Sequence, residues 1–243
     1  MSSEKLRVDY NRPPILEATL EYRFESALSS RNFEQFQSRI AREYPFVETL
    51  SSVNINFDGR ELQASPQPMS LKMTNREASG VCFFSPYLIG VSALAPYSGW
   101  ADLTARFQSV AEDLRKIGGF RKIVRAGTRT VNRIDIPVKD GPHIQIEDYL
   151  NAYIKLPIEM GVLGAFSIRG DIVDGDFVTV INSSAFPPPS LRFISIGLDI
   201  DVSTANLTAQ NEPYFQEIVE TLHERKNRMF EMSITDNARE LFA

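Results

Sequence analysis

Three arginines recur at every fourth position of one largely apolar stretch, residues 124–136. Arg125, Arg129 and Arg133 share a face of that stretch if it is a β-strand, because residues an even number apart point to the same side. A row of guanidinium groups on a sheet can bind phosphate or carboxylate groups through paired hydrogen bonds. These arginines are therefore candidate ligands for an anion such as a nucleotide or an RNA phosphate.

Acidic residues on other predicted strands offer the arginines a structural role instead. The acids are Glu17, Glu21 and Glu25 on one strand and Asp199 and Asp201 on another. An exposed ion pair contributes less than about 1 kcal/mol, but a network on a shared sheet face fixes strand register. The net charge of -5 favours this second interpretation, in which the arginines pair across strands.

A histidine and an asparagine lie four residues apart in a predicted helix. His223 and Asn227 are side by side at that spacing, next to the apolar stripe of the helix. They could make a polar contact to the sheet, or His223 could act as a catalytic base with a sheet carboxylate. A histidine beside an apolar stripe is more often a structural hydrogen-bonding residue. We therefore name no catalytic residue and expect no enzyme.

Carboxylate clusters suggest metal sites only weakly. Asp171, Asp174 and Asp176 crowd a predicted hairpin but lack the spacing of a calcium loop, and we expect a solvated turn. Asp135 could join the acids of the last strand around Mg²⁺ only if those strands are neighbours. No motif for a serine nucleophile, a zinc site or a phosphate-binding loop occurs, so we expect neither a metal nor a cofactor.

Composition limits the class of protein. With 43% hydrophobic and 23% charged residues, the 243-residue chain is expected to fold as a globular protein. Its acidity argues against non-specific nucleic-acid binding. The chain has one cysteine, Cys82, in an apolar run that predicts a buried, inert thiol. We find no apolar run of membrane-spanning length and no signal peptide, and so expect a cytoplasmic protein without a membrane partner.

Two similar series of elements are expected to position these residues. The first is a strand over 16–24, a helix over 33–44, strands over 53–57, 69–73, 81–84 and 87–94, and a helix over 98–117. The second is a strand over 123–136, a short helix over 146–153, strands over 166–172, 177–181 and 191–200, a helix over 212–231 and a short helix over 236–242. The helix starts are assigned to a capping box of Asn32 with Gln35, to Ser98, and to a box of Ser233 with Asp236.

The repetition predicts an α+β fold made of two pseudo-repeats, residues 1–119 and 120–243. The segments IGVSAL and IGLDID, which begin at Ile89 and Ile196, each precede a long helix and support an internal duplication. We expect the halves to form one continuous, curved antiparallel sheet with both long helices on its convex face, as in TATA-binding-protein-like and helix-grip folds. Fold class alone implies no function.

Three segments carry a family resemblance: RPPILEATLEYRF from Arg12, GTRTVNRIDIP from Gly127, and LHERKNRMFEMSITDNARELF from Leu222. Taken together, the chain resembles a sporadically distributed family of uncharacterised prokaryotic proteins of about this length. Thr130 stands where that family's pattern has an aromatic residue. The resemblance implies that Arg129, Asn132, Arg133, His223 and Asn227 belong to the family pattern, and it implies no reaction.

Three functions follow as hypotheses. The leading one is a non-catalytic binding or scaffold protein that uses the open sheet face or edges to hold a protein partner or a second copy of itself, so that a homodimer is plausible. The second is an anion-binding protein that uses the arginines at 125, 129 and 133. The third is an enzyme that uses His223 with a carboxylate.

Overall fold

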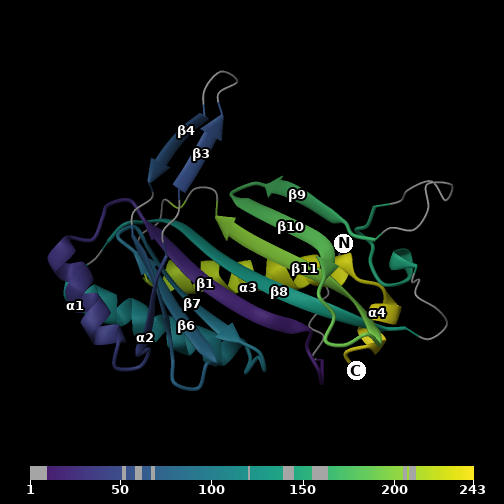
Figure 1. The fold of residues 1–243 in the computed structure, drawn as a ribbon. Coiled ribbons are helices and arrows are strands. Elements are labelled where there is room, and N and C mark those ends of the chain that lie inside the picture. Colours follow the sequence, from purple (N-terminus) through teal and green to yellow (C-terminus); the bar gives the residue numbers. More distant parts are fainter. Residues whose placement is uncertain are drawn as a thin grey trace. The chain divides into compact units, whose positions relative to one another are not determined.

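The computed structural model describes residues 10–50, 53–57, 62–66, 69–119, 121–138, 145–154, 164–204, 207 and 212–243 (Figure 1). The side chains within 53–57, 62–66 and 212–215 are outside that description. His143, the histidine other than His223, also lies outside the described residues.

The α+β class is confirmed, because the described residues form one large antiparallel sheet and four α-helices. The order of its nine strands is β2 (Phe46–Leu50), β5 (Ser70–Thr74), β6 (Gly80–Ser85), β7 (Leu88–Leu94), β1 (Ile15–Phe24), β8 (Ile123–Pro137), β11 (Phe193–Thr204), β10 (Phe177–Phe186) and β9 (Ser167–Asp174). β3 (Val53–Phe57) and β4 (Leu62–Pro66) pair in a separate hairpin.

The chain divides into two compact units. Unit 1 contains Met1–Ala18, Gly127–Asn206 and Asn211–Ala243. Unit 2 contains Thr19–Ala126 and Leu207–Gln210. Strands β1 and β8 contribute residues to both units.

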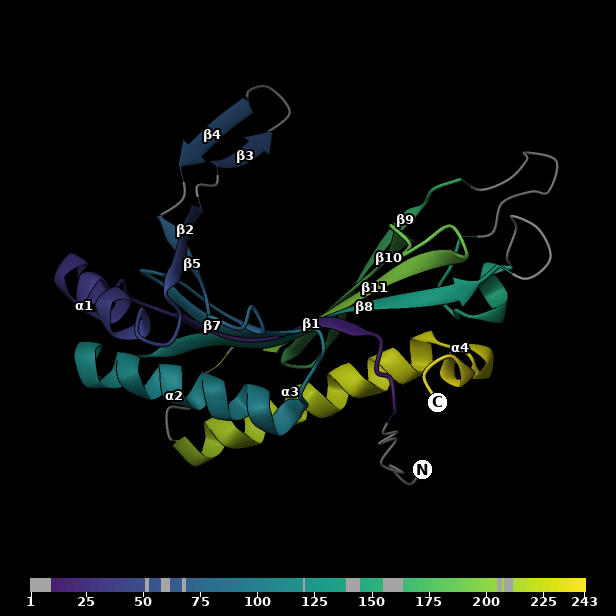
Figure 2. The same cartoon turned by 60° about the horizontal axis from the view of Figure 1, so that its bottom comes forward.

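Helices α1 (Ser30–Ile40) and α2 (Trp100–Gly118) belong to unit 2, where Figure 2 shows α2 running along β7. On α1, the rings of Phe33 and Phe36 pack against Phe84 of β6 at centroid distances of 5.0 and 4.9 Å. The buried residues of α2 are Leu103, Phe107, Val110 and Leu114, which is the stripe that their spacing predicts. These apolar contacts place the core of unit 2 between the two helices and the strands.

The starts of these helices differ from the sequence prediction. The Ser29 hydroxyl accepts a hydrogen bond from the Asn32 amide at 3.3 Å, so α1 begins one turn earlier than the predicted Asn32 box. Ser98 is not the cap of α2: Gly99 holds that position, and the Ser98 hydroxyl donates to the Asp102 carboxylate. Ser29, Ser30 and Asn32 are all candidate caps near the start of α1, and Ser98 and Gly99 are adjacent before α2, so the sequence does not decide which residue takes the cap.

Helix α3 (Glu212–Ser233) lies along one face of β11 in unit 1 (Figure 2). That face carries Ile196, Leu198, Ile200 and Val202, each at most 1% exposed. Leu222 of α3 is fully buried as well. Alternate residues of β11 thus form the floor on which α3 packs.

The segment around η1 is tied to the C-terminal part of unit 1. The 3-10 helix η1 (Ile146–Asp148) precedes Tyr149, whose carbonyl accepts a hydrogen bond from Thr235 at 3.0 Å. Thr235, and not the predicted Ser233, caps α4 (Asp236–Glu240). The Ser233 hydroxyl donates to the Met229 carbonyl instead.

Each of the segments IGVSAL and IGLDID contains a glycine beneath a phenylalanine ring. A Cβ on Gly90 would lie 2.0 Å from Cζ of Phe83, its partner on β6. A Cβ on Gly197 would lie 2.8 Å from Cδ2 of Phe186 on β10. Both positions therefore need glycine, because the ring occupies the space of a side chain.

Candidate binding surfaces

Strand β8 has two faces of opposite character in unit 1. Thr128, Thr130 and Asn132 are each at most 2% exposed, and their β11 partners are the buried residues Val202, Ile200 and Leu198. The intervening positions Arg129 and Arg133 point to the other face, which we call the outer face. The alternation confirms the predicted strand and separates Asn132 from the arginines named with it.

Arg129 is held by Asp199 of β11 on the outer face. Its Nε lies 2.8 Å from Oδ1 and its second terminal nitrogen lies 2.7 Å from Oδ2, so the pair is bidentate. The hydrogen bond to Asp199 raises the pKa of Arg129, and the nearby charges of Glu17 and Asp201 act in the same direction. Asn182 of β10 also donates to Asp199 at 3.4 Å.

The other two arginines have carboxylate partners as well. Arg133 Nε donates to Asp135 Oδ2 at 3.1 Å, and Asp135 also accepts a hydrogen bond from the Ser195 hydroxyl. In unit 2, Arg125 pairs with Glu21 of β1. A ligand anion would have to displace a carboxylate from each guanidinium, so the arrangement matches the structural interpretation of the row.

His223 and Asn227 are brought together as their spacing predicts. His223 Nε2 lies 3.1 Å from Asn227 Nδ2, and both side chains are half-buried on α3. Asn132, the third amide-type candidate, donates to the Leu198 carbonyl at 2.9 Å and so binds its neighbouring strand. These contacts support structural hydrogen bonding by all three residues.

A buried lysine is the polar feature that the sequence analysis missed. Lys226 is 3% exposed and lies on α3 four residues from both Leu222 and Phe230, on the buried side of the helix. Burial lowers the pKa of Lys226 to about 8. The spacing of four residues to Leu222 and Phe230 indicated that Lys226 lies on the buried side of the helix, but a lysine is normally assigned to the solvent side.

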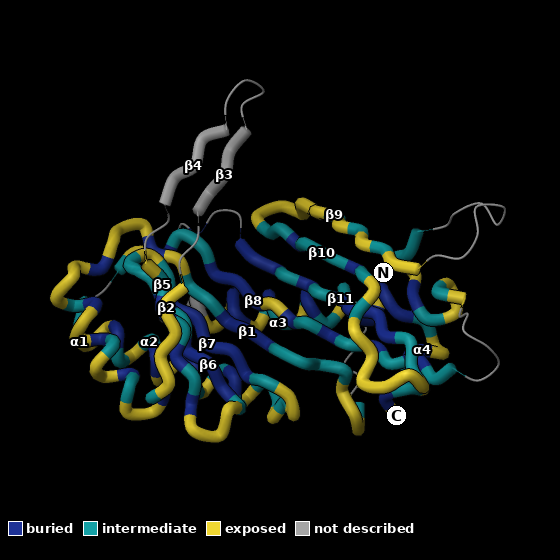
Figure 3. Tube along the Cα trace, in the orientation of Figure 1, coloured by how far each residue is buried: buried dark blue, intermediate teal, exposed yellow. Residues whose placement is uncertain are grey.

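The sheet ends in two strands with exposed apolar residues. Figure 3 shows β2 and β9 largely in yellow. All five residues of β2 are exposed, with Phe46, Val47 and Leu50 between 44% and 59% accessible. On β9, Ile172 and Val173 are 44% and 72% accessible. Strand β2 was not predicted, although FVETL, directly after Pro45, has the composition of a short strand.

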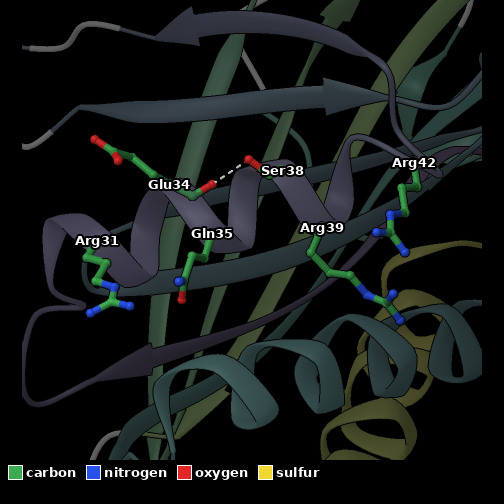
Figure 4. Close-up of a pocket in the computed structure, with 6 residues that line it drawn as sticks. All are labelled: Arg31, Glu34, Gln35, Ser38, Arg39 and Arg42. Carbon is green, nitrogen blue, oxygen red and sulfur yellow. Dashed lines mark hydrogen bonds between the residues drawn. The ribbon is translucent and has the colours of Figure 1, made fainter.

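A groove of about 460 Å³ lies along α1 in unit 2 (Figure 4). The residues that line it are Arg31, Glu34, Gln35, Ser38, Arg39 and Arg42. Arg39 forms a bidentate pair with Asp113 of α2, at 2.8 and 3.1 Å. Nothing in the sequence distinguishes these arginines, because their helical spacing is that of an ordinary solvent-facing stripe.

The metal hypotheses gain no support from the residues that the structure describes, among which no three potential ligands gather. Asp174 instead pairs with Arg225 at 2.7 Å, and that guanidinium stacks 4.1 Å above the Phe177 ring. The hairpin tip is therefore attached to α3.

Cys82 is fully buried in unit 2 as predicted, and burial raises the pKa of its thiol, which disfavours reaction.

Comparisons with known proteins add little. No protein-family model matches the chain, and no curated protein matches it. A solved structure described as a "putative adenylate cyclase" from Bacillus halodurans is similar over 87% of this chain and 91% of that chain, with 9% identity and a TM-score of 0.14. At that TM-score the likeness supports no argument about fold or function.

None of the described helices is long and apolar enough to cross a membrane.

Proposed function

We propose that this chain is a non-catalytic binding or scaffold protein that holds a protein partner, or a second copy of itself, along the β2 edge of its sheet. The exposure of all five β2 residues at a sheet end carries the proposal. An edge strand presents backbone donors and acceptors to which another strand can pair. The apolar side chains of Phe46, Val47 and Leu50 add surface that a partner would remove from water.

Strand β2 suits this role better than β9. The charged side chains of β9 include the pair Arg169–Asp171 at 3.1 Å, and charges of this kind discourage pairing with a second strand. On β2 the charge is Glu48, which Lys72 of β5 pairs at 3.1 Å. The β2 edge is thus more apolar than the β9 edge and less protected by charge.

The contacts of the β8 arginines and of His223 do not favour the anion-binding and enzyme hypotheses. The arginines of β8 already bind carboxylates, so the anion-binding alternative lacks an available cation on that strand. His223 is oriented by Asn227 on its own helix, and this contact favours a structural role over catalysis. Edge binding requires neither group.

The internal duplication and the helix-grip arrangement of the sheet stay predictions. Internal duplication is supported by the strand order, since β1-β7-β6-β5 matches β8-β11-β10-β9 when each is read from the middle of the sheet. The glycines at 90 and 197, each beneath a phenylalanine ring, support it further. A curved sheet of the helix-grip type, with both long helices on its convex face, is the arrangement we expect from such a duplication.

The proposal is tested by replacing apolar side chains on the edge. We expect the double variant Phe46→Lys, Leu50→Lys to shift the protein from dimer to monomer in light scattering over a concentration series, or to lose partners that wild type retains when captured from its native host. The matched control is Leu191→Lys, Met232→Lys, which makes the same chemical change at positions 99% and 57% exposed. Equal assembly and equal capture by wild type and both variants would refute edge binding.

A further inference from the structure

We propose that the groove on α1 receives an acidic segment of the protein that docks on β2. This inference rests on the proposed function and assigns a chemistry to the partner. The groove belongs to the same unit as the edge, and the two are continuous in the chain: α1 ends at Ile40 and β2 begins at Phe46. We treat them as one docking surface because only residues 41–45 separate the helix from the strand.

Two of the groove's arginines lie near its two ends. Arg31, Gln35 and Ser38 follow each other along α1 at spacings of four and three residues, and Arg42 lies in the turn directly after the helix ends at Ile40. From Arg31 to the end of α1 at Ile40 the distance along the axis is roughly 14 Å at the rise of an α-helix, and Arg42 lies in the turn beyond. That length corresponds to about four residues of an extended peptide, so several acidic side chains of one segment can reach it.

The charge of the groove is positive although the chain is acidic. Three arginines line it against one glutamate, Glu34. Asp113 neutralises Arg39, but within the described part of the chain neither Arg31 nor Arg42 has a carboxylate partner. This is the reverse of β8, where all three arginines are paired. The cations able to accept an anionic group thus lie on α1 and not on the strand that the sequence analysis favoured.

A carboxylate-bearing protein segment fits this groove better than a nucleic acid does. The overall charge of -5 opposes the approach of a polyanion, whose binding depends on neutralising many phosphates. Glu34, three residues from Arg31, lines the same groove and would repel a continuous phosphate backbone. Separated glutamates or aspartates can instead pair with Arg31 and Arg42. Arginine forms two parallel hydrogen bonds with a carboxylate, which gives orientation as well as attraction.

The two surfaces would contribute differently to binding. Charges at the rim of an interface mainly accelerate association and make it sensitive to salt, whereas buried apolar contacts slow dissociation. We therefore assign steering to the groove and retention to β2. Removing the arginines should reduce the salt dependence, and removing the β2 side chains should leave it unchanged.

The test uses fluorescence anisotropy with a labelled synthetic peptide in which a run of glutamates is followed by alternating valine and threonine. Wild type should bind this peptide and lose affinity as salt rises. Arg31→Glu, Arg42→Glu should weaken binding at least tenfold at low salt and remove most of the salt dependence. The matched control is Arg192→Glu, Arg228→Glu, which causes the same change in net charge at two other exposed arginines and should bind like wild type. Circular dichroism and thermal unfolding of both variants should match wild type.

Each result that contradicts the expectation shows whether the acidic groove or the β2 edge is wrongly assigned. Unchanged peptide binding by Arg31→Glu, Arg42→Glu, together with loss of binding by Phe46→Lys, Leu50→Lys, overturns the acidic groove and leaves edge docking standing. Equal weakening in the two charge variants overturns it too, because the effect then belongs to net charge. Tighter binding of a labelled single-stranded oligonucleotide than of the peptide assigns the groove to nucleic acid and refutes an acidic protein segment. Failure of wild type to bind the peptide refutes the inference, while the light-scattering test of the β2 edge keeps its own result.

Discussion

Arg129 and Asp199 form a diagonal pair across β8 and β11. In the register of these strands Arg129 faces Asp201, and Asp199 faces Val131, so the bidentate contact spans two residue positions. Diagonal partners on one face of an antiparallel pair are within reach of long side chains. A shift by one residue would break the contact, because it would move Asp199 to the opposite face. The pair therefore specifies how β8 and β11 align.

Replacing Asp199 with asparagine should lower stability modestly. The change removes the charge but keeps the shape, and we expect a loss of about 1 kcal/mol at most because half of the Arg129 side chain is in solvent. Urea unfolding of Asp199→Asn at low and high salt measures the loss, which should shrink at high salt. Asp171→Asn breaks a more exposed pair with Arg169 and should change the unfolding free energy by less. A larger loss for Asp171→Asn would contradict the assignment.

The buried Lys226 should make stability rise with pH. Its pKa is about 8 in the folded protein and 10.5 when unfolded, so between these values the unfolded state binds more protons. The free energy of unfolding should increase from pH 8 to pH 10.5 by on the order of 3 kcal/mol, at 1.4 kcal/mol per pKa unit. This contribution is complete above the unfolded pKa and is lost as pH falls through the folded pKa.

Lys226→Met isolates this effect because methionine has a similar length and no charge. The difference in unfolding free energy between wild type and Lys226→Met should follow the predicted rise, while contributions of the tyrosines cancel. Lys116→Met is the control, since Lys116 is an exposed helix lysine paired with Glu112. A pH profile of Lys226→Met parallel to wild type would show that the lysine is not desolvated.

Gly90→Ala should strain the β6–β7 pair of unit 2. The new methyl group would overlap the Phe83 ring, which must rotate away, and overpacking of this kind costs about 1–3 kcal/mol. A double-mutant cycle with Phe83→Ala measures the coupling, because the added methyl group should cost little once the ring is gone. Gly170→Ala is the matched control, where the nearest side-chain atom is 3.4 Å from the new Cβ. Additive effects of Gly90→Ala and Phe83→Ala would show that the ring does not occupy this site.

Glu231→Gln should disturb the polar contacts between α3 and α4. The Glu231 carboxylate is nearly buried and accepts hydrogen bonds from Tyr10 Oη at 2.7 Å and Arg239 Nε at 2.9 Å. We expect a loss of about 2 kcal/mol, because charged hydrogen bonds in a buried site contribute more than neutral ones. The pKa of Tyr10, which burial and the bond to Glu231 both raise, should fall partway toward its ordinary value in an ultraviolet titration.

Asp236→Asn provides the comparison for this site. Asp236 contacts the same arginine at 2.6 Å but is 95% exposed, so its loss should hardly change the unfolding free energy. If Asp236→Asn proved as destabilising as Glu231→Gln, the contribution would come from α4 capping and not from the buried carboxylate.

The sequence predicts elements well where side-chain type alone decides burial. The alternation in β8 and the stripe of Leu103, Phe107, Val110 and Leu114 in α2 are such cases. Prediction from sequence fails where the chemical type of a residue does not match its location in the fold. Lys226 occupies a buried place that a lysine rarely takes, and the residues of β2, FVETL, do not alternate between apolar and polar.

The ion pairs of the β8 arginines could be predicted only as a set of possible acidic partners. The acidic rows that include Glu21 and Asp199 were recognised, but their assignment to individual arginines depends on strand order and register, which are long-range properties. Arg133 pairs with Asp135 of its own strand, a choice that the cross-strand hypothesis did not include. The α1 groove had no sequence signal, because its significance depends on which described arginines are paired with carboxylates in the fold, as Arg39 is with Asp113.

The burial of Cys82 has a practical consequence for experiments on this protein. A thiol that is fully enclosed and resists ionisation reacts slowly with maleimides or spin-label reagents. A cysteine introduced at an exposed site can thus be labelled in the otherwise native sequence, without first removing the natural thiol and its packing. Dyes or paramagnetic groups placed this way would report distances from chosen surface positions in solution.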